Sequence, residues 1–94
     1  MNNFSNLNHL PADLKILIVN GQTLVNEAKA AMKDPKYRFD LTSKMQLKTD
    51  CREVEKYIKL IANGKLTEKN KAGLESASTR LKTNLTGIIG FYLR

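Results

Sequence analysis

The sequence predicts an all-α protein, an antiparallel bundle of three long helices with a short fourth element as an alternative. Apolar residues recur at alternating spacings of four and three in three separate segments, which is the period of a helix with one buried face. Proline and glycine mark the ends of the first two segments. Aromatic residues form only 6% of the chain, so the core has to be packed mainly through Leu, Ile, Val and Ala.

The first predicted helix begins at Pro11, because proline is tolerated in the first turn of a helix. It ends near Lys33, since Asp34 precedes Pro35 and is pushed out of helical geometry. A glycine inside a helix costs about 1 kcal/mol relative to alanine, so we expect a neighbouring backbone to come close to Gly21. The apolar face of this helix consists of Leu14, Ile18, Gly21, Val25, Ala28 and Met32.

The second predicted helix covers residues 43–62 and follows an irregular stretch, residues 34–43. A lone strand would have no partner, so we interpret this stretch as a connector or a short helical turn, with Thr42 or Ser43 as the cap of the helix. Asn63-Gly64 ends the helix, because glycine readily enters left-handed geometry. The apolar face consists of Leu47, Cys51, Val54, Ile58 and Ile61.

The third predicted helix begins after Thr67, a favourable N-cap residue. Three glycines and several Ser and Thr residues weaken its intrinsic helical preference, so we expect packing or a partner to hold its last two turns. Its apolar face consists of Leu74, Ala77, Leu81, Leu85, Ile88 and Tyr92.

The domain organisation follows from the length and from the polar start of the chain. Residues 1–10 are rich in Asn and are predicted to be a flexible N-terminal segment, and residues 11–94 form a single helical-bundle domain. The candidates for a short fourth helix are residues 3–9 and 35–41.

The net charge of +7 lies entirely in residues 36–94, which hold thirteen Lys and Arg against six Asp and Glu. Such asymmetry indicates an acidic protein partner, nucleic acid or an anionic membrane surface, although a charge that only maintains solubility is an alternative. The sharpest feature is a basic stripe on the second helix, which is either a docking surface or a solvated face. The stripe consists of Lys44, Lys48, Arg52, Lys56 and Lys59.

The C-terminal end of the third helix is a second candidate for partner binding. It carries more large apolar side chains than one helical face can bury, and exposed apolar patches often mark a contact with a partner. Packing onto the core is the competing interpretation. The candidate residues are Ile88, Ile89, Phe91, Tyr92, Leu93 and Arg94.

The sequence offers no catalytic residue, no metal ligand set and no cofactor-binding motif. His9 is the only histidine and Cys51 the only cysteine, so neither a nucleophile with its base nor a cluster of metal ligands is indicated. The single cysteine favours a reducing compartment, and no apolar run approaches the roughly 20 residues that span a bilayer. We therefore expect a non-enzymatic cytoplasmic protein without a transmembrane segment, with peripheral membrane association as a variant.

Three short segments carry a resemblance to a known family. They are Lys33-Asp34-Pro35-Lys36-Tyr37, Lys65-Leu66-Thr67-Glu68 and Gly90-Phe91-Tyr92-Leu93-Arg94. In these segments, and in its length, basic charge and helical pattern, the chain resembles the immunity proteins that protect producers of class IIa (pediocin-like) bacteriocins. The resemblance implies a four-helix bundle whose C-terminal portion engages a complex of bacteriocin and mannose-phosphotransferase receptor at the cytosolic side of the membrane. The sequence differs from that expectation in showing only three long helical patterns.

The leading functional prediction is therefore a non-catalytic protective protein that binds a membrane-associated receptor complex. One alternative is a nucleic-acid-associated accessory protein of a phage or plasmid that uses the basic stripe. Another is a small adaptor that pairs with a second helical chain through the seam formed by Gly21 and Ala28. The sequence leaves the oligomeric state open.

Overall fold

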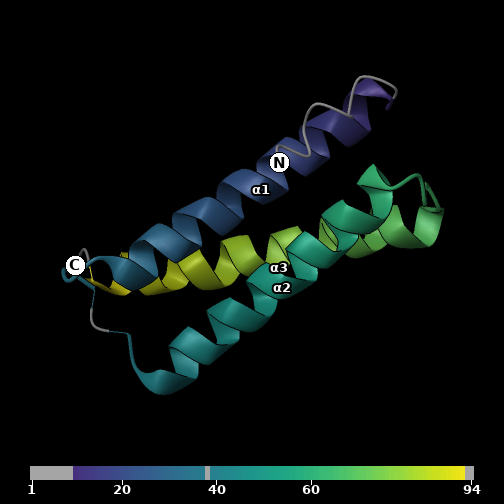
Figure 1. Cartoon of the computed structure of the whole chain (residues 1–94). Helices are drawn as coiled ribbons and strands as arrows, with labels where there is room; N and C mark the ends of the chain where they lie inside the picture. The colour runs from purple at the N-terminus through teal and green to yellow at the C-terminus, as the bar shows by residue number, and fades with distance from the viewer. Residues whose placement is uncertain (1–9, 38, 93–94) are drawn as a thin grey trace.

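Three long helices make up almost all of the part of the chain that the structure describes, which comprises residues 10–37 and 39–92, with the backbone alone for residues 91 and 92. In this computed structural model, α1 spans Ala12–Lys33, α2 spans Leu41–Ala62 and α3 spans Glu68–Tyr92. Consecutive helices run in opposite directions, and each packs against the other two (Figure 1). The predicted all-α class with three long helices is confirmed, and the molecule is elongated, 42 × 25 × 20 Å.

The connector between α1 and α2 contains a turn instead of a fourth helix in its described residues. The backbone N–H of Tyr37 donates to the carbonyl oxygen of Asp34 at 3.1 Å, and the backbone N–H of Lys36 donates to the Asp34 carboxylate at 2.9 Å. The connector interpretation is therefore confirmed, and residues 35–40 contribute no helix where they are described. The other candidate for a fourth helix, residues 3–9, lies outside the described residues.

The predicted flexible segment also lies outside the described residues, except for its last member. Leu10 is 5% exposed and belongs to the apolar core. The packed part of the chain therefore includes the residue immediately before Pro11.

The core lies along the axis of the bundle, where the apolar faces predicted for the three helices meet. A Cβ atom on Gly21 would lie 3.1 Å from Val54 Cγ1 and 3.2 Å from Ser78 Oγ. The atoms nearest to this position therefore belong to side chains of α2 and α3 and not to a backbone. Since Ala28 is also fully buried, the seam is occupied by the chain's own helices and offers no free surface to a second chain.

Two of the predicted helix signals are confirmed and one is wrong. The Thr67 hydroxyl accepts from the backbone N–H of Asn70 at 3.1 Å, and Gly64 has a φ of 94° after the end of α2. The cap of α2 is Asp40 instead of Thr42 or Ser43, and its carboxylate accepts from the backbone N–H of Ser43 at 2.7 Å. This hydrogen bond lowers the pKa of Asp40, because it favours the charged carboxylate beside the positive end of the helix dipole.

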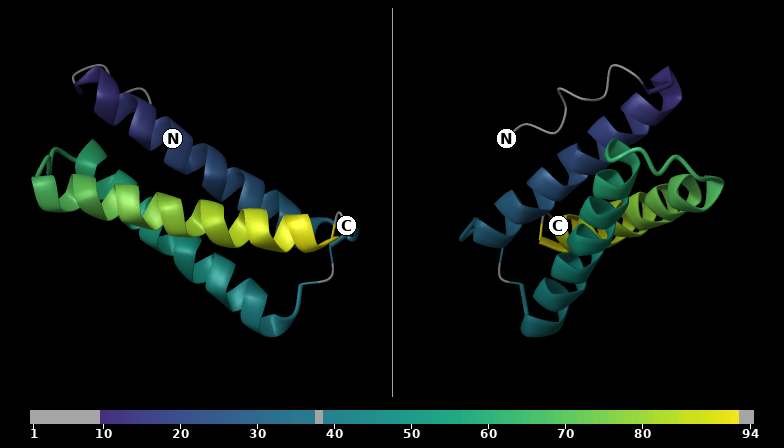
Figure 2. Two further views of the ribbon diagram at one scale, coloured as in Figure 1. Left: turned by 180° about the vertical axis from the view of Figure 1, so that it is seen from behind. Right: turned by 45° about the vertical axis from the view of Figure 1, so that its right-hand side comes forward.

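One end of the bundle is more open than the other. The last turns of α1 and the first turns of α2 lie at the same end of the molecule, and the first turns of α2 diverge from both other helices (Figure 2). At this end, the last turns of α3 lie next to the last turns of α1 (Figure 2). A groove can therefore form between α1 and α2 at this end. In the described part of the chain, no helix combines the length and the apolar character needed to cross a membrane.

Candidate functional site

A groove of about 490 Å³ lies between the second half of α1 and the first half of α2, and we call it the basic groove. The connector between the two helices is short, so the C-terminal turns of α1 must face the N-terminal turns of α2. The groove is lined by Lys29, Met32 and Lys33 from α1 and by Lys44, Lys48, Cys51, Arg52 and Glu55 from α2.

A single ion pair joins the two walls of the basic groove among the described residues. Lys29 Nζ lies 3.3 Å from Glu55 Oε1, and both side chains are about half exposed, at 51% and 43%. An exposed ion pair of this kind contributes only about 0–1 kcal/mol to stability. Its main effect is to neutralise Lys29 together with Glu55, the only carboxylate among the described residues that line the groove.

The remaining cations of the groove have no ion-pair partner among the described residues. No carboxylate of the described residues lies at ion-pairing distance from Lys33, Lys44, Lys48 or Arg52. Lys33, Lys48 and Arg52 are exposed, and Lys44 is half-buried. Lysine and arginine at four-residue spacing on a helix repel one another by a few tenths of a kcal/mol per pair. The groove therefore concentrates positive charge at a small cost to the stability of α2.

The floor of the groove is apolar and contains sulfur. Met32 is half-buried, and Cys51 is only 3% exposed. Burial, together with the negative charge of Glu55, raises the pKa of Cys51 to about 11. The thiol is therefore protonated at neutral pH, and it acts as a small apolar group instead of a nucleophile. The described residues contain no group of three His, Cys, Asp or Glu side chains that could share a metal ion.

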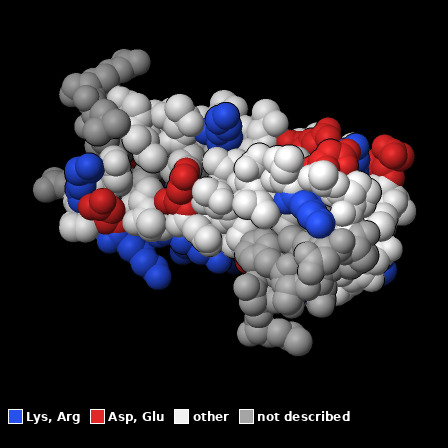
Figure 3. Space-filling view, turned by 90° about the horizontal axis from the view of Figure 1, so that it is seen from above, with Lys and Arg blue, Asp and Glu red and all other residues white. Residues whose placement is uncertain are grey.

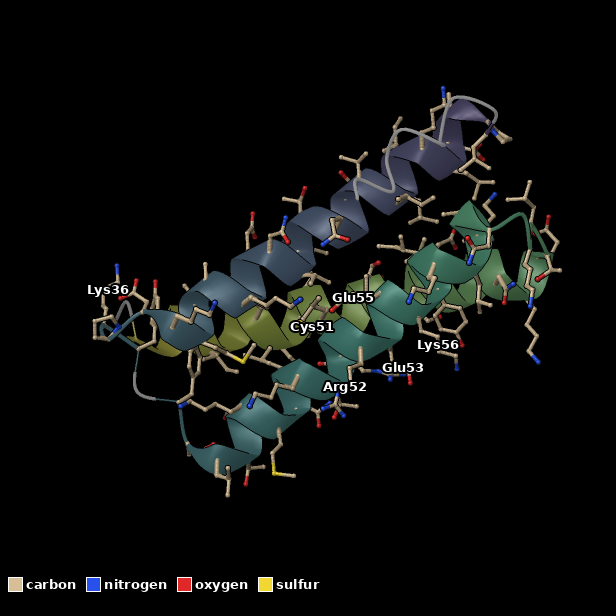
Figure 4. All side chains as sticks on the ribbon, viewed as in Figure 1. Lys36, Cys51, Arg52, Glu53, Glu55 and Lys56 are labelled. Atoms are coloured by element: carbon tan, nitrogen blue, oxygen red, sulfur yellow. The ribbon has the colours of Figure 1, made fainter. Side chains whose placement is uncertain are left out.

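The predicted basic stripe divides into two parts in the structure. Its first three members line the groove, whereas Lys56 and Lys59 lie further along α2 and do not. Lys56 Nζ lies 5.2 Å from the ring centroid of Tyr57, and Figure 4 shows Lys56 closer than Arg52 to the C-terminal end of α2. Glu55 turns toward α1 and pairs with Lys29 instead of with Lys59, which lies four residues further along α2.

The contribution of α1 to the groove was missed from the sequence. Lys29 and Lys33 fall in a region whose charges sum to zero, so the charge count gave no reason to single them out. A usable signal was nevertheless present, because each lysine directly follows a member of the apolar face, Ala28 or Met32. Residues at the edge of an apolar face lie at the seam with a neighbouring helix.

The structure covers the C-terminal candidate surface only in part. Ile88 and Ile89 are half-buried and pack against the core. The side chains of Phe91 and Tyr92, and the whole of Leu93 and Arg94, lie outside the description. The large apolar side chains that are exposed in the described residues lie elsewhere, at Ile16, Val19, Leu41, Met45 and Leu66.

The charge distribution differs between the two ends of the molecule. In Figure 3, Lys and Arg gather along the lower left edge, at the end where α1 finishes and α2 begins, and Asp and Glu gather at the upper right. The edge with Lys and Arg belongs to the end of the molecule that holds the basic groove. Comparison of the chain with family models, with curated proteins and with solved structures finds no match, so the ligand of the groove has to be inferred from the chemistry of the groove itself.

Proposed function

We propose that this chain is a non-catalytic binding protein that recognises an acidic surface of a protein partner through the basic groove. The observation that supports this proposal most directly is the placement of unpaired cations on both walls of a concave, apolar-floored site. Cations that form no ion pair within the described part of the chain can bind carboxylates of another molecule. Binding would also relieve the mutual repulsion within α2.

The proposal that the protein is not an enzyme is supported by the raised pKa of the Cys51 thiol. It is the only cysteine of the chain and lies on the floor of the groove, where any bound ligand would pass near it. A nucleophilic cysteine needs a depressed pKa, whereas burial raises the pKa of this one. The site is therefore suited to holding a partner and not to reacting with it.

A narrower proposal is that the chain acts as a protective protein of the bacteriocin-immunity type at a membrane-associated receptor complex. It is supported by the resemblance described above, and one of the resembling segments borders the groove. That segment begins with Lys33, a residue of the groove wall, and continues through the turn at Asp34 into the connector. One of the three resembling segments thus lies beside the groove, whereas Lys65-Leu66-Thr67-Glu68 lies at the opposite end of the molecule.

The test of this proposal is protection in cells. The chain is expressed in a bacterium that is sensitive to pediocin-like bacteriocins, and survival is measured against a panel of them. The groove variant Lys33→Gln/Lys48→Gln/Arg52→Gln removes three unpaired cations of the groove. The matched control Lys56→Gln/Lys59→Gln/Lys65→Gln removes the same charge from exposed positions outside it.

We expect the unaltered chain and the control variant to protect and the groove variant to fail. Equal protection by all three proteins would show that the basic groove is not the working surface. Loss of protection only on removal of residues 91–94 would assign the function to the C-terminal candidate surface. Failure of the unaltered chain against every bacteriocin of the panel would contradict the immunity role.

A further inference from the structure

The walls and floor of the basic groove indicate which kind of acidic surface it fits, and this inference rests on the proposed function. We propose that the groove receives a single amphipathic helix of the partner. The apolar face of that helix lies on Met32 and Cys51. Acidic side chains along both edges of the helix pair with the cations of α1 and α2.

The spacing of the cations matches the spacing of side chains along a helix. On α2, the unpaired cations Lys44, Lys48 and Arg52 follow one another at four residues. On α1, the unpaired cation is Lys33, which follows Lys29 at the same spacing, and Lys29 pairs with Glu55. Four residues of an α-helix rise about 6 Å, so each wall presents its charges at steps of about this length. A partner helix with Asp or Glu at four-residue spacing on each edge repeats these steps.

The apolar floor of the groove favours a protein helix as the ligand over a polyanion such as nucleic acid. Met32 adapts its flexible side chain to neighbouring apolar groups, and the protonated thiol of Cys51 is a small apolar surface beside it. A phosphate backbone has no apolar group to place there. Leu, Ile or Val side chains on the central face of an amphipathic helix would cover this floor and be removed from water.

Nucleic acid fits the groove less well for three further reasons. None of the described residues that line the groove is aromatic, so they offer single-stranded bases no stacking surface. The positive charge lines a concave site, whereas duplex recognition usually inserts a protruding helix into the major groove. Glu55 would in addition place a carboxylate inside the phosphate-binding site, although Lys29 neutralises it. The observations therefore favour the acidic helix.

The experiment measures binding of defined probes to the full-length protein by fluorescence anisotropy. The first probe is a fluorescein-labelled helical peptide of about five turns with a central Leu stripe and Glu at four-residue spacing along both edges. A second peptide replaces the Leu stripe by Gln and keeps the acidic residues. The third probe is a labelled DNA duplex of about 20 base pairs.

We expect the acidic Leu peptide to bind and the acidic Gln peptide to bind more weakly. The groove variant Lys33→Gln/Lys48→Gln/Arg52→Gln should weaken binding of the Leu peptide about ten-fold, because three partly exposed ion pairs together contribute about that factor. The control variant Lys56→Gln/Lys59→Gln/Lys65→Gln should bind it as the unaltered chain does. Circular dichroism of both variants checks that they remain folded.

Two methionines provide a readout of the floor that does not depend on charge. Met32 lies in the groove, whereas Met45 is 59% exposed on α2 and is not part of the lining. With methyl-labelled methionine, addition of the Leu peptide should shift the Met32 resonance and leave that of Met45 nearly unchanged. Equal shifts of both, or a shift of Met45 alone, would overturn the proposed position of the helix.

Three results would overturn the inference: no binding of the Leu peptide, an equal loss of binding in the groove and control variants, or equal binding of the Leu and Gln peptides. Duplex binding that is lost selectively in the groove variant, together with weak peptide binding, would replace the acidic helix by nucleic acid. These results are independent of the protection assay. Peptide binding at the groove without protection in cells would leave the inference standing and reject only the immunity role.

Discussion

Asp50 places a carboxyl group inside a largely apolar core, with only 1% of the residue exposed. Two amide groups donate to it, from Gln46 Nε2 at 3.1 Å on the same helix and from Asn84 Nδ2 at 2.7 Å on α3. Because a buried acceptor without a donor costs about 1–3 kcal/mol, the pair of α2 and α3 is favoured in the one alignment that brings Asn84 to Asp50. The interaction therefore specifies how the two helices pack.

Replacement of Asn84 by alanine should lower the free energy of unfolding by about 1–3 kcal/mol, because the carboxyl group of Asp50 loses its shorter hydrogen bond while it stays buried. Urea denaturation followed by circular dichroism measures this change. Thr83→Ala is the matched control, since Thr83 is exposed on the same helix and should change stability by less than about 0.5 kcal/mol. Equal effects of the two substitutions would contradict a structural role for the buried interaction.

The raised pKa of Cys51 makes stability depend on pH in the alkaline range. In the unfolded chain the thiol loses its proton near its ordinary pKa of 9.0, whereas in the folded protein burial holds the proton until about pH 11. Between these values the folded state binds more protons than the unfolded state, so stability falls as pH rises. Below about pH 8 both states hold the proton, and the thiol contributes no pH dependence.

Cys51→Ala should therefore remove part of the alkaline loss of stability. We expect the free energy of unfolding of the unaltered chain to fall more steeply than that of the variant between about pH 9 and pH 11. Between pH 6 and pH 8 the two proteins should differ by a constant amount that reflects the volume removed from the core. Parallel curves over the whole range would show that the thiol ionises equally in both states.

Cys51 and Asp50 show how far single residues could be predicted. The burial of Cys51 followed from its place in the spacing of the apolar face, and the structure confirms it. Asp50 is adjacent to Cys51 and equally buried, yet apolar spacing predicts aspartate only on the solvent side. Its burial depends on Asn84, a donor 34 residues away, and no local pattern reveals that pairing.

At the scale of the helices, Gly21 of α1 and Gly87 of α3 lie in different surroundings. The space beside Gly21 is filled by Val54 and Ser78, both buried, whereas a Cβ atom on Gly87 would meet nothing within 4 Å. Ser78 is also the one buried side chain in the described residues whose hydroxyl has no hydrogen-bond partner. The packing around Gly21 is thus tight and already leaves one buried hydroxyl without a hydrogen bond, whereas there is free space beside Gly87.

Alanine substitutions at these two glycines should have opposite effects. Gly87→Ala should raise the free energy of unfolding by about 0.5–1 kcal/mol, because alanine favours the helix and its methyl group enters open space. Gly21→Ala should lower it, since the same helical gain is outweighed by crowding against Val54 and Ser78 at 3.1 and 3.2 Å. Thermal unfolding of both variants is the measurement. Stabilisation by Gly21→Ala would show that α1 can move away without loss of packing.

The helices themselves were largely predictable because each is defined by a local signal. The spacing of apolar residues, Pro35 and the Asn63-Gly64 pair gave the limits of α1 and α2 to within about two residues. The start of α2 was predicted at residue 43 instead of Leu41. The reason is that Asp40 lies in the irregular stretch 34–43 and was not recognised as the capping residue. Asp40 was identifiable in principle, since a carboxylate three residues before a free backbone N–H is a common cap.

At the scale of the whole molecule, the basic groove depends on how two helices are placed and not on either helix alone. The sequence singled out Lys44, Lys48 and Arg52 because they share one face of one helix. It did not separate them from Lys56 and Lys59, nor did it add Lys29 and Lys33. Those distinctions follow from the divergence of α2 from α1, which is a property of the packed bundle (Figure 2).

The basic groove and the connector between α2 and α3 lie at opposite ends of the molecule. Residues 29–52 hold seven Lys and Arg against three Asp, which is a net charge of +4 out of the total of +7 in about a quarter of the chain. The cations of the basic groove favour contact with a negative surface at this end of the molecule. The connector at residues 63–67 lies at the other end of a body 42 Å long. That connector is therefore where a fluorophore or a fused domain should interfere least with docking at the groove.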